Sequence, residues 1–120
     1  MEFFNNAMQI VVDSDDSVSG DMTVDLRSNV YDIRTYQGYS IQAEYSGSPV
    51  GALKIQVSND DPLDSPTQDW VDLADSEIAI SSAGTYVFNV EIAYYGWIRL
   101  VWTATSGSGT LTAKIVMKGA

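Results

Sequence analysis

Residues 97–118 have the sequence WIRLVWTATSGSGTLTAKIVMK, which is the strongest signal for β-structure in the chain. In 97–104 apolar residues fall on both sides of an extended strand, which is typical of a strand inside a sheet. A flexible Ser-Gly turn follows at 105–109. In 110–118 every second residue is apolar, and this set is Leu111, Ala113, Ile115 and Met117. The stretch therefore predicts an antiparallel hairpin whose second strand buries one face.

A second pair of segments shows the same alternation. The apolar positions are Tyr39, Ile41, Ala43 and Tyr45 in one segment and Leu53, Ile55 and Val57 in the other. Between them, residues 46–51 (SGSPVG) have the composition of a turn. We therefore predict a second antiparallel hairpin from 39–45 and 53–58.

Shorter segments of strand-forming composition complete the pattern: 8–12, 22–26, 70–73 and 85–90, with 79–84 read as a strand end that enters a turn. About eight short strands separated by regular turns are typical of a sandwich or a barrel. At 120 residues the chain is the size of one domain. We predict a single all-β domain over residues 1–120, an antiparallel, jelly-roll-like β-sandwich of about eight strands.

Composition excludes several kinds of chemistry. The chain has no cysteine and no histidine, so a disulfide, a thiolate nucleophile, a Ser-His-Asp triad and a histidine zinc site are impossible. The chain has 16 acidic and 6 basic residues, which gives a net charge of −10. This negative charge repels nucleic acid and anionic membranes. The opening MEFFNNAMQIVV has neither a basic region nor a long apolar run. We therefore expect no secretory signal, no membrane span and no cofactor.

Two acidic groups are calcium candidates, because closely spaced carboxylates supply hard oxygen ligands. They are Asp13, Asp15 and Asp16 in the first group and Asp60, Asp61 and Asp64 in the second. The EF-hand pattern requires Gly and Glu where the first group has Val18 and Val24, so that pattern fails. The alternative for the first group is a solvated loop. For the second, it is a long loop that protrudes or contacts a partner.

The carboxylates and the aromatic residues each have a functional and a structural interpretation. Carboxylates with apolar neighbours occur at Glu44, Asp69, Asp72 and Glu91. A glycosidase needs an acid and a base that face one another, whereas these positions face outward in the predicted strands, so we predict no enzyme. The aromatic residues Tyr94, Tyr95 and Trp97, with Trp70 and Trp102, suit a sugar-stacking platform. The alternative is that Trp70 and either Trp97 or Trp102 fill the core.

Roughly residues 37–119 carry an ordered series of landmarks. These are YSIQ (39–42), GALKIQVSND (51–60), WVDL (70–73), SSAG (81–84), YGWIRLVW (95–102), SGSG (106–109) and TAKIVMKG (112–119). The series resembles the small β-sandwich structural proteins of bacteriophage virions, which decorate or cement capsids or serve in head fibres and tail adaptors. The strand at 97–100 also resembles those of discoidin-like galactose-binding sandwiches.

The resemblance implies a capsid decoration or minor capsid protein, synthesised in the host cytoplasm and located in the virion. Its partners would be the major capsid protein or tail components, and it would assemble as a homo-oligomer such as a trimer. A carbohydrate-binding module for host recognition is the alternative function.

Five residues are interface candidates: Phe3, Phe4, Tyr94, Tyr95 and Arg99. Phe3 and Phe4 lie in an otherwise polar segment, residues 1–7, which we interpret as an N-terminal arm that docks on a neighbour. The alternative is that the arm folds back on its own sandwich. Arg99 lies alone in an apolar strand and is a candidate subunit contact. Its alternative is a pair with a carboxylate of the same chain, or a side chain that reaches to water.

Overall fold

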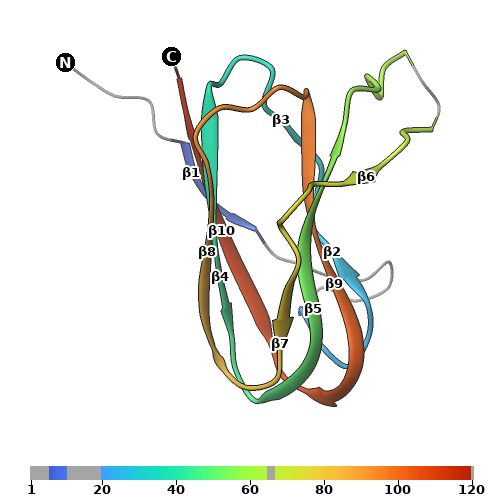
Figure 1. Cartoon of the computed structure of the whole chain (residues 1–120), viewed down its shortest axis with the longest axis vertical. Helices are drawn as coiled ribbons and strands as arrows, with labels where there is room; N and C mark the ends of the chain where they lie inside the picture. Colours follow the sequence, from blue (N-terminus) through green and yellow to red (C-terminus); the bar gives the residue numbers. More distant parts are fainter. Residues whose placement is uncertain (1–5, 11–19, 65–66, 120) are drawn as a thin grey trace.

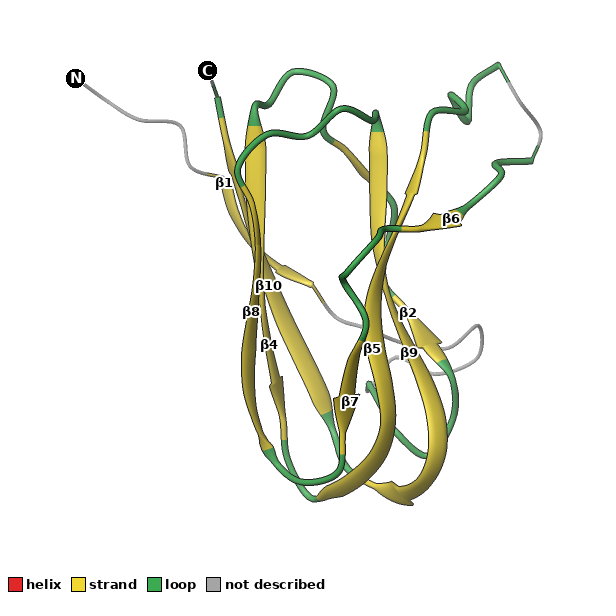
Figure 2. Cartoon of the chain, in the orientation of Figure 1, coloured by secondary structure: helices red, strands yellow, loops and turns green. Residues whose placement is uncertain are grey.

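The computed structural model describes residues 6–10, 20–64 and 67–119. These residues form ten strands in two antiparallel sheets that pack face to face (Figures 1 and 2). The described residues contain no helix, and accordingly no helix long and apolar enough to cross a membrane. The all-β antiparallel sandwich predicted from the sequence is confirmed.

The chain passes repeatedly from one sheet to the other. Sheet A has the order β1 (Asn6–Ile10), β10 (Leu111–Lys118), β4 (Gly38–Tyr45) and β8 (Gly84–Val90). Sheet B has β2 (Leu26–Arg27) and β3 (Tyr31–Asp32) on one side of β9 (Trp97–Ser108), then β5 (Ser48–Ser58), then β6 (Val71–Asp72) and β7 (Ile78–Ile80). If each split edge counts as one strand, about eight strands remain in a jelly-roll order, as predicted.

The core lies between the sheets and is built from the alternating residues. In sheet A, Ile41 lies opposite Ile115 of β10 and Phe88 of β8. In sheet B, Leu53 lies opposite Trp102. The predicted inward faces of 53–58 and 110–118 are confirmed, because Leu53, Ile55 and the apolar set of β10 are buried and Val57 packs against them. Strand alternation thus sets which residues form the core.

Both predicted hairpins are wrong. β4 and β5 lie in different sheets, as do β9 and β10, and neither pair is hydrogen-bonded. The links at 46–47 and 109–110 carry the chain from one sheet to the other at the same end of the sandwich (Figure 2). A turn reverses the direction of the chain, but its composition does not determine whether the next strand stays in the same sheet. Here each strand finds its partners far along the sequence.

The two links lie side by side. The Ser46 amide donates to the Thr110 carbonyl at 3.1 Å, and the extended ends of β5 and β9 pair from Ser48 opposite Ser108 onward. Gly107 has φ 78°, and a Cβ there would collide with the Ser48 carbonyl oxygen. This position therefore requires glycine, because other residues are strained at that φ and the backbone leaves no room.

The edges of sheet B are short and interrupted. The predicted strand 22–26 is largely wrong, since Met22 lies in a turn and only Leu26 enters β2. Between β6 and β7 the chain does not pair with β5 as a strand. There the Ser76 side chain makes hydrogen bonds in place of the backbone. Its Oγ accepts the Ile55 amide at 3.1 Å and donates to the Leu73 carbonyl at 2.7 Å. Such short edges offer little backbone to a foreign strand.

Candidate functional site

One edge of sheet A is the strand β8, Gly84–Val90. Its sequence GTYVFNV has no charged residue and no proline, and its only strand partner in the described part of the chain is β4. Val87 is 52% exposed and Tyr86 is 40% exposed. Natural proteins usually protect an edge with charge, proline, a bulge or a short strand. β8 has none of these, and it is therefore open to a further strand.

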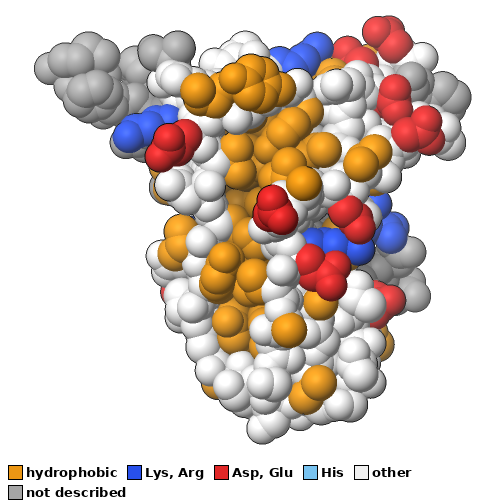
Figure 3. Space-filling model, in the orientation of Figure 1, with side chains coloured by type: hydrophobic (Ala, Val, Ile, Leu, Met, Phe, Trp, Pro, Cys, Tyr) orange, Lys and Arg blue, Asp and Glu red, His pale blue; other side chains and the backbone are white. Residues whose placement is uncertain are grey.

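An apolar strip adjoins this edge on the open side of the sandwich. It runs between β8 and β7 on the face shown in Figure 3. Part of it is a groove of about 280 Å³. Its lining is mainly apolar and also includes polar groups: Ile55, Leu73, Ala74, Tyr86, Val87, Phe88 and Val90, with Asp75, Ser76 and Asn89. Tyr86 and Phe88 meet edge to face, with ring centroids 4.9 Å apart. β8 thus offers unpaired backbone beside an aromatic, partly exposed surface.

A second surface is the outer face of sheet B, where Arg99 lies over the ring of Trp70 at 4.4 Å. The Arg99 Nε donates to Gln56 Oε1 at 2.8 Å, and Gln56 Nε2 donates to Asp72 at 2.9 Å. Asp72 also pairs with Lys54 at 3.0 Å. The hydrogen bond from Gln56 and then that from Lys54 lower the pKa of Asp72. Among the described residues, Arg99 is thus held by an amide and an aromatic ring, whereas one of the two alternatives expected a carboxylate.

The aromatic residues do not form a flat platform. Trp102 is fully buried and Trp97 is 6% exposed, so the prediction that one of them fills the core is confirmed. Trp70 is only partly buried, and its predicted place in the core is wrong. It precedes β6, which pairs on the edge of β5 with Asp72 opposite Gln56. Alternation therefore directs Trp70 to the same outer face as Asp72.

The two tyrosines among the interface candidates differ in exposure. Tyr95 is half-buried, and its hydroxyl shares a hydrogen bond of 2.9 Å with the hydroxyl of Tyr39. Burial raises the pKa of both. Tyr94 is 83% exposed. Of the two, Tyr94 is therefore the one whose ring is accessible to a partner.

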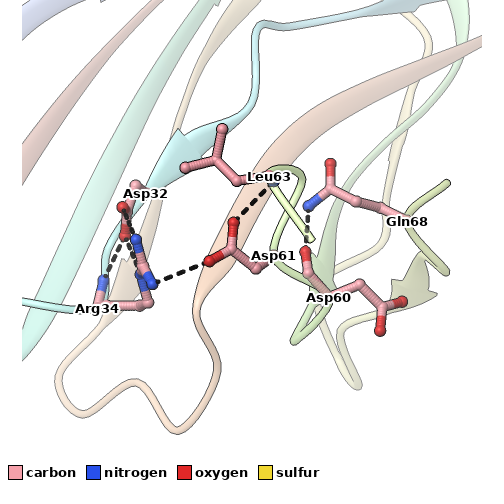
Figure 4. Close-up of polar contacts among 6 residues, drawn as sticks. All are labelled: Asp32, Arg34, Asp60, Asp61, Leu63 and Gln68. Atoms are coloured by element: carbon pink, nitrogen blue, oxygen red, sulfur yellow. Dashed lines mark hydrogen bonds and ion pairs between the residues drawn. The ribbon is translucent and has the colours of Figure 1, made fainter. Parts of the chain in front are cut away.

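The second acidic group is part of a loop held together by its own carboxylates (Figure 4). Asp61 accepts the Leu63 amide at 2.9 Å and pairs with Arg34 at 3.4 Å. Asp60 accepts the Asp69 amide at 2.7 Å. Among the described residues no three acidic side chains gather as a metal site. The structure therefore does not group Asp60, Asp61 and Asp64, the three calcium candidates of this loop, as a metal site.

The other candidates lie outside the described residues. These are Phe3 and Phe4 of the predicted arm and Asp13, Asp15 and Asp16 of the first acidic group. The docking arm and the calcium site on the first group stay predictions.

The ion pair between Asp32 and Arg34 lowers the pKa of Asp32, and this can be tested by titration. The Arg34 side chain and then its backbone amide donate to Asp32 and hold its pKa below the ordinary 3.8. A lowered pKa in the folded state stabilises the fold above the unfolded value, and this stabilisation is lost as pH falls below it. In Arg34→Gln we expect the Asp32 pKa to rise toward 3.8, measured by carbon NMR of the carboxyl. Asp72 is the control and should titrate unchanged. An unchanged Asp32 would contradict the assignment.

Sequence reasoning missed β8 as an interaction surface. The segment 85–90 was predicted as a strand, but its place at an edge depends on pairing with β4, which no local pattern indicates. The available signal was the lack of charge over residues 84–90 in a chain of net charge −10. A strand of that composition is unusual at an edge.

Comparisons with known proteins identify similar folds. No family model matches the chain, and no curated protein matches it. The SPBc2 prophage-derived protein YomS is similar over 97% of both chains, with a TM-score of 0.56 and 10% identity. PirA is similar over 98% of this chain and 95% of its own, with a TM-score of 0.49 and 12% identity.

Carbohydrate-binding modules are also among the similar structures. The N-terminal cellulose-binding domain of a β-1,4-glucanase from Cellulomonas fimi has a TM-score of 0.42 and 9% identity, over 94% of this chain and 86% of its own. At such identities the match to YomS shows a shared fold alone.

Proposed function

We propose that this chain is a non-enzymatic structural subunit of a bacteriophage virion, a capsid decoration or minor capsid protein that acts through protein–protein contacts. The observation that carries the proposal is the unprotected edge of β8, with its exposed Tyr86 and Val87. The landmark pattern of residues 37–119 resembles that of phage virion proteins, and YomS, which has a similar fold, derives from a prophage.

An open strand edge can accept a further strand. Its backbone amides and carbonyls can pair with any extended segment, so an edge without charge or proline promotes association. Addition of a strand gives affinity through main-chain hydrogen bonds and specificity through alternate side chains. A virion structural subunit can use such a contact to bind a neighbouring protein or another copy of itself, and the contact needs no catalytic group.

The test is association with particles. Mass spectrometry of purified particles from a phage that encodes the chain should detect it at a fixed ratio to the major capsid protein. In co-sedimentation, Val87→Lys should reduce binding at least about tenfold, because a lysine on an edge strand opposes the addition of a further strand. Gln42→Lys is the matched control, since Gln42 lies opposite Val87 on the interior strand β4. Absence from particles, or equal binding by both variants, would overturn the proposal.

Glycan binding is the competing function, and the exposed ring of Tyr94 is the observation that favours it. Tyr94→Ala separates the two functions. Under our proposal this variant sediments with particles as the natural chain does. A glycan-array signal that Tyr94→Ala abolishes would favour the carbohydrate-binding module instead.

A further inference from the structure

β8 differs from the other edge strands in length. The edges of sheet B are split into β2 and β3 on one side and β6 and β7 on the other, each of two or three residues. β1, at the far edge of sheet A, has five residues. β8 has seven and is regular throughout its pairing with β4. In the described part of the chain, β8 therefore offers the longest free edge.

The residue pattern of β8 fits a second copy of the same strand, because the aromatic Tyr86 and Phe88 flank Val87 symmetrically, as do the polar Thr85 and Asn89 further out. Two copies with a net charge of −10 each repel one another, so they associate best where neither contributes a charge. β8 is such a place, because residues 84–90 are all uncharged. An antiparallel pair of identical strands is also self-complementary, since a two-fold axis relates its halves.

We propose that β8 pairs with β8 of a second copy, antiparallel about a two-fold axis at Val87, an inference that rests on the proposed function. This register overlaps all seven residues. Val87 then lies opposite Val87 of the copy, Thr85 opposite Asn89, and Tyr86 opposite Phe88. Sheet A of one copy and sheet A of the other then form one continuous sheet. The outer face of one copy continues into the outer face of the other, and the inner faces do the same.

On the inner face of the joined sheet, this register gives the exposed ring of Tyr86 a neighbour. Tyr86 and Phe88 already meet edge to face within one chain at 4.9 Å, and the second copy brings Phe88 against Tyr86 and Tyr86 against Phe88. Cross-strand aromatic pairs are favourable neighbours in antiparallel sheets. The four rings would cover the apolar groove between β8 and residues 73–76. The pairing thus buries both the open backbone and the adjoining apolar strip.

Light scattering gives the first test. The purified chain should have twice its mass of 13.1 kDa, because a two-fold contact closes at two subunits. This replaces the trimer expected from the resemblance. Higher salt should tighten the dimer, since it screens repulsion between the acidic bodies. A stable monomer at tens of micromolar, or a trimer, would overturn the inference.

Cysteine cross-linking tests the register, and the chain is suited to it because it has no cysteine of its own. Under mild oxidation Val87→Cys should form a disulfide-linked dimer, since opposed residues of a strand pair lie within bonding reach. Asn89→Cys alone should not, whereas a mixture of Thr85→Cys and Asn89→Cys should cross-link. Equal cross-linking by Val87→Cys and Asn89→Cys would overturn the register.

A charge variant separates this inference from the proposed function. Val87→Lys should be monomeric and Gln42→Lys dimeric, with circular dichroism confirming that both are folded. If the natural chain binds particles as a monomer and Val87→Cys fails to cross-link, self-pairing is wrong and the virion role stands. If the chain dimerises through β8 but is absent from particles, the virion role is wrong and self-pairing stands.

Discussion

Replacement of Trp102 by alanine is expected to lower the free energy of unfolding by about 3–5 kcal/mol. The side chain is fully buried and lies opposite Leu53 in the centre of sheet B. Its indole N–H donates to the Met22 carbonyl at 3.0 Å. The variant therefore leaves both a cavity and a buried carbonyl without its donor, and each of these costs stability.

Urea unfolding followed by circular dichroism measures this loss. Trp70→Ala is the matched control, because the same side chain is removed from the outer face of the same sheet. It should cost about 1 kcal/mol or less, the worth of an exposed contact with Arg99. A loss below about 1 kcal/mol in Trp102→Ala would contradict the central place of this residue in the core.

The second large effect is expected from Gly51→Ala. A Cβ at Gly51 would collide with the Thr103 carbonyl oxygen and lie 2.7 Å from Cη2 of Trp102. Backbone and a packed ring cannot both move aside, so we expect a loss of about 1–3 kcal/mol or more. Gly119→Ala is the control, because no atom lies within 4 Å of its added Cβ. Equal stability of the two variants would contradict the close approach of β5 to β9.

The two sites are in contact, so their effects should not add. Removal of the Trp102 ring relieves one of the two collisions at residue 51 but leaves the one with Thr103. Gly51→Ala should therefore cost less in the Trp102→Ala background than in the natural chain. The same urea measurements on the double variant check this, and strict additivity would mean that the ring is not the obstacle.

The layers of the sandwich could be predicted from local pattern, but the pairing of strands could not. Alternation in 39–45, 53–58 and 110–118 identified the buried faces, because the period of two belongs to a strand whatever its partner. The turns at 46–51 and 105–109 were interpreted as hairpin loops. In the structure most of each segment belongs to β5 or β9, and only the short links at 46–47 and 109–110 carry the chain to the other sheet. Which strand becomes a neighbour depends on contacts between distant residues, which a single sequence does not display.

In the candidate site, too, residue types could be predicted from the sequence but their contacts could not. Arg99 was correctly placed in a central strand, but its contacts with Gln56 and Trp70 arise from β5 and from the segment before β6, both remote in sequence. Trp70 was assigned to the core from its type alone, although it lies on an outer face. The open edge of β8 follows only from the order of sheet A. Residue types can thus indicate what kind of side chain is available, while topology decides what it meets.

The place of β10 within sheet A has a consequence for synthesis. Among the strands of the described residues it comes last in sequence, yet it lies between β1 and β4 and pairs with both. While the chain is being translated, β1 and β4 have no partner on these sides until residues 111–118 emerge. Sheet A is therefore completed only after residues 111–118 have been synthesised, and pairings this distant in sequence fold slowly. During that interval the nascent chain exposes strand edges that the finished sandwich conceals.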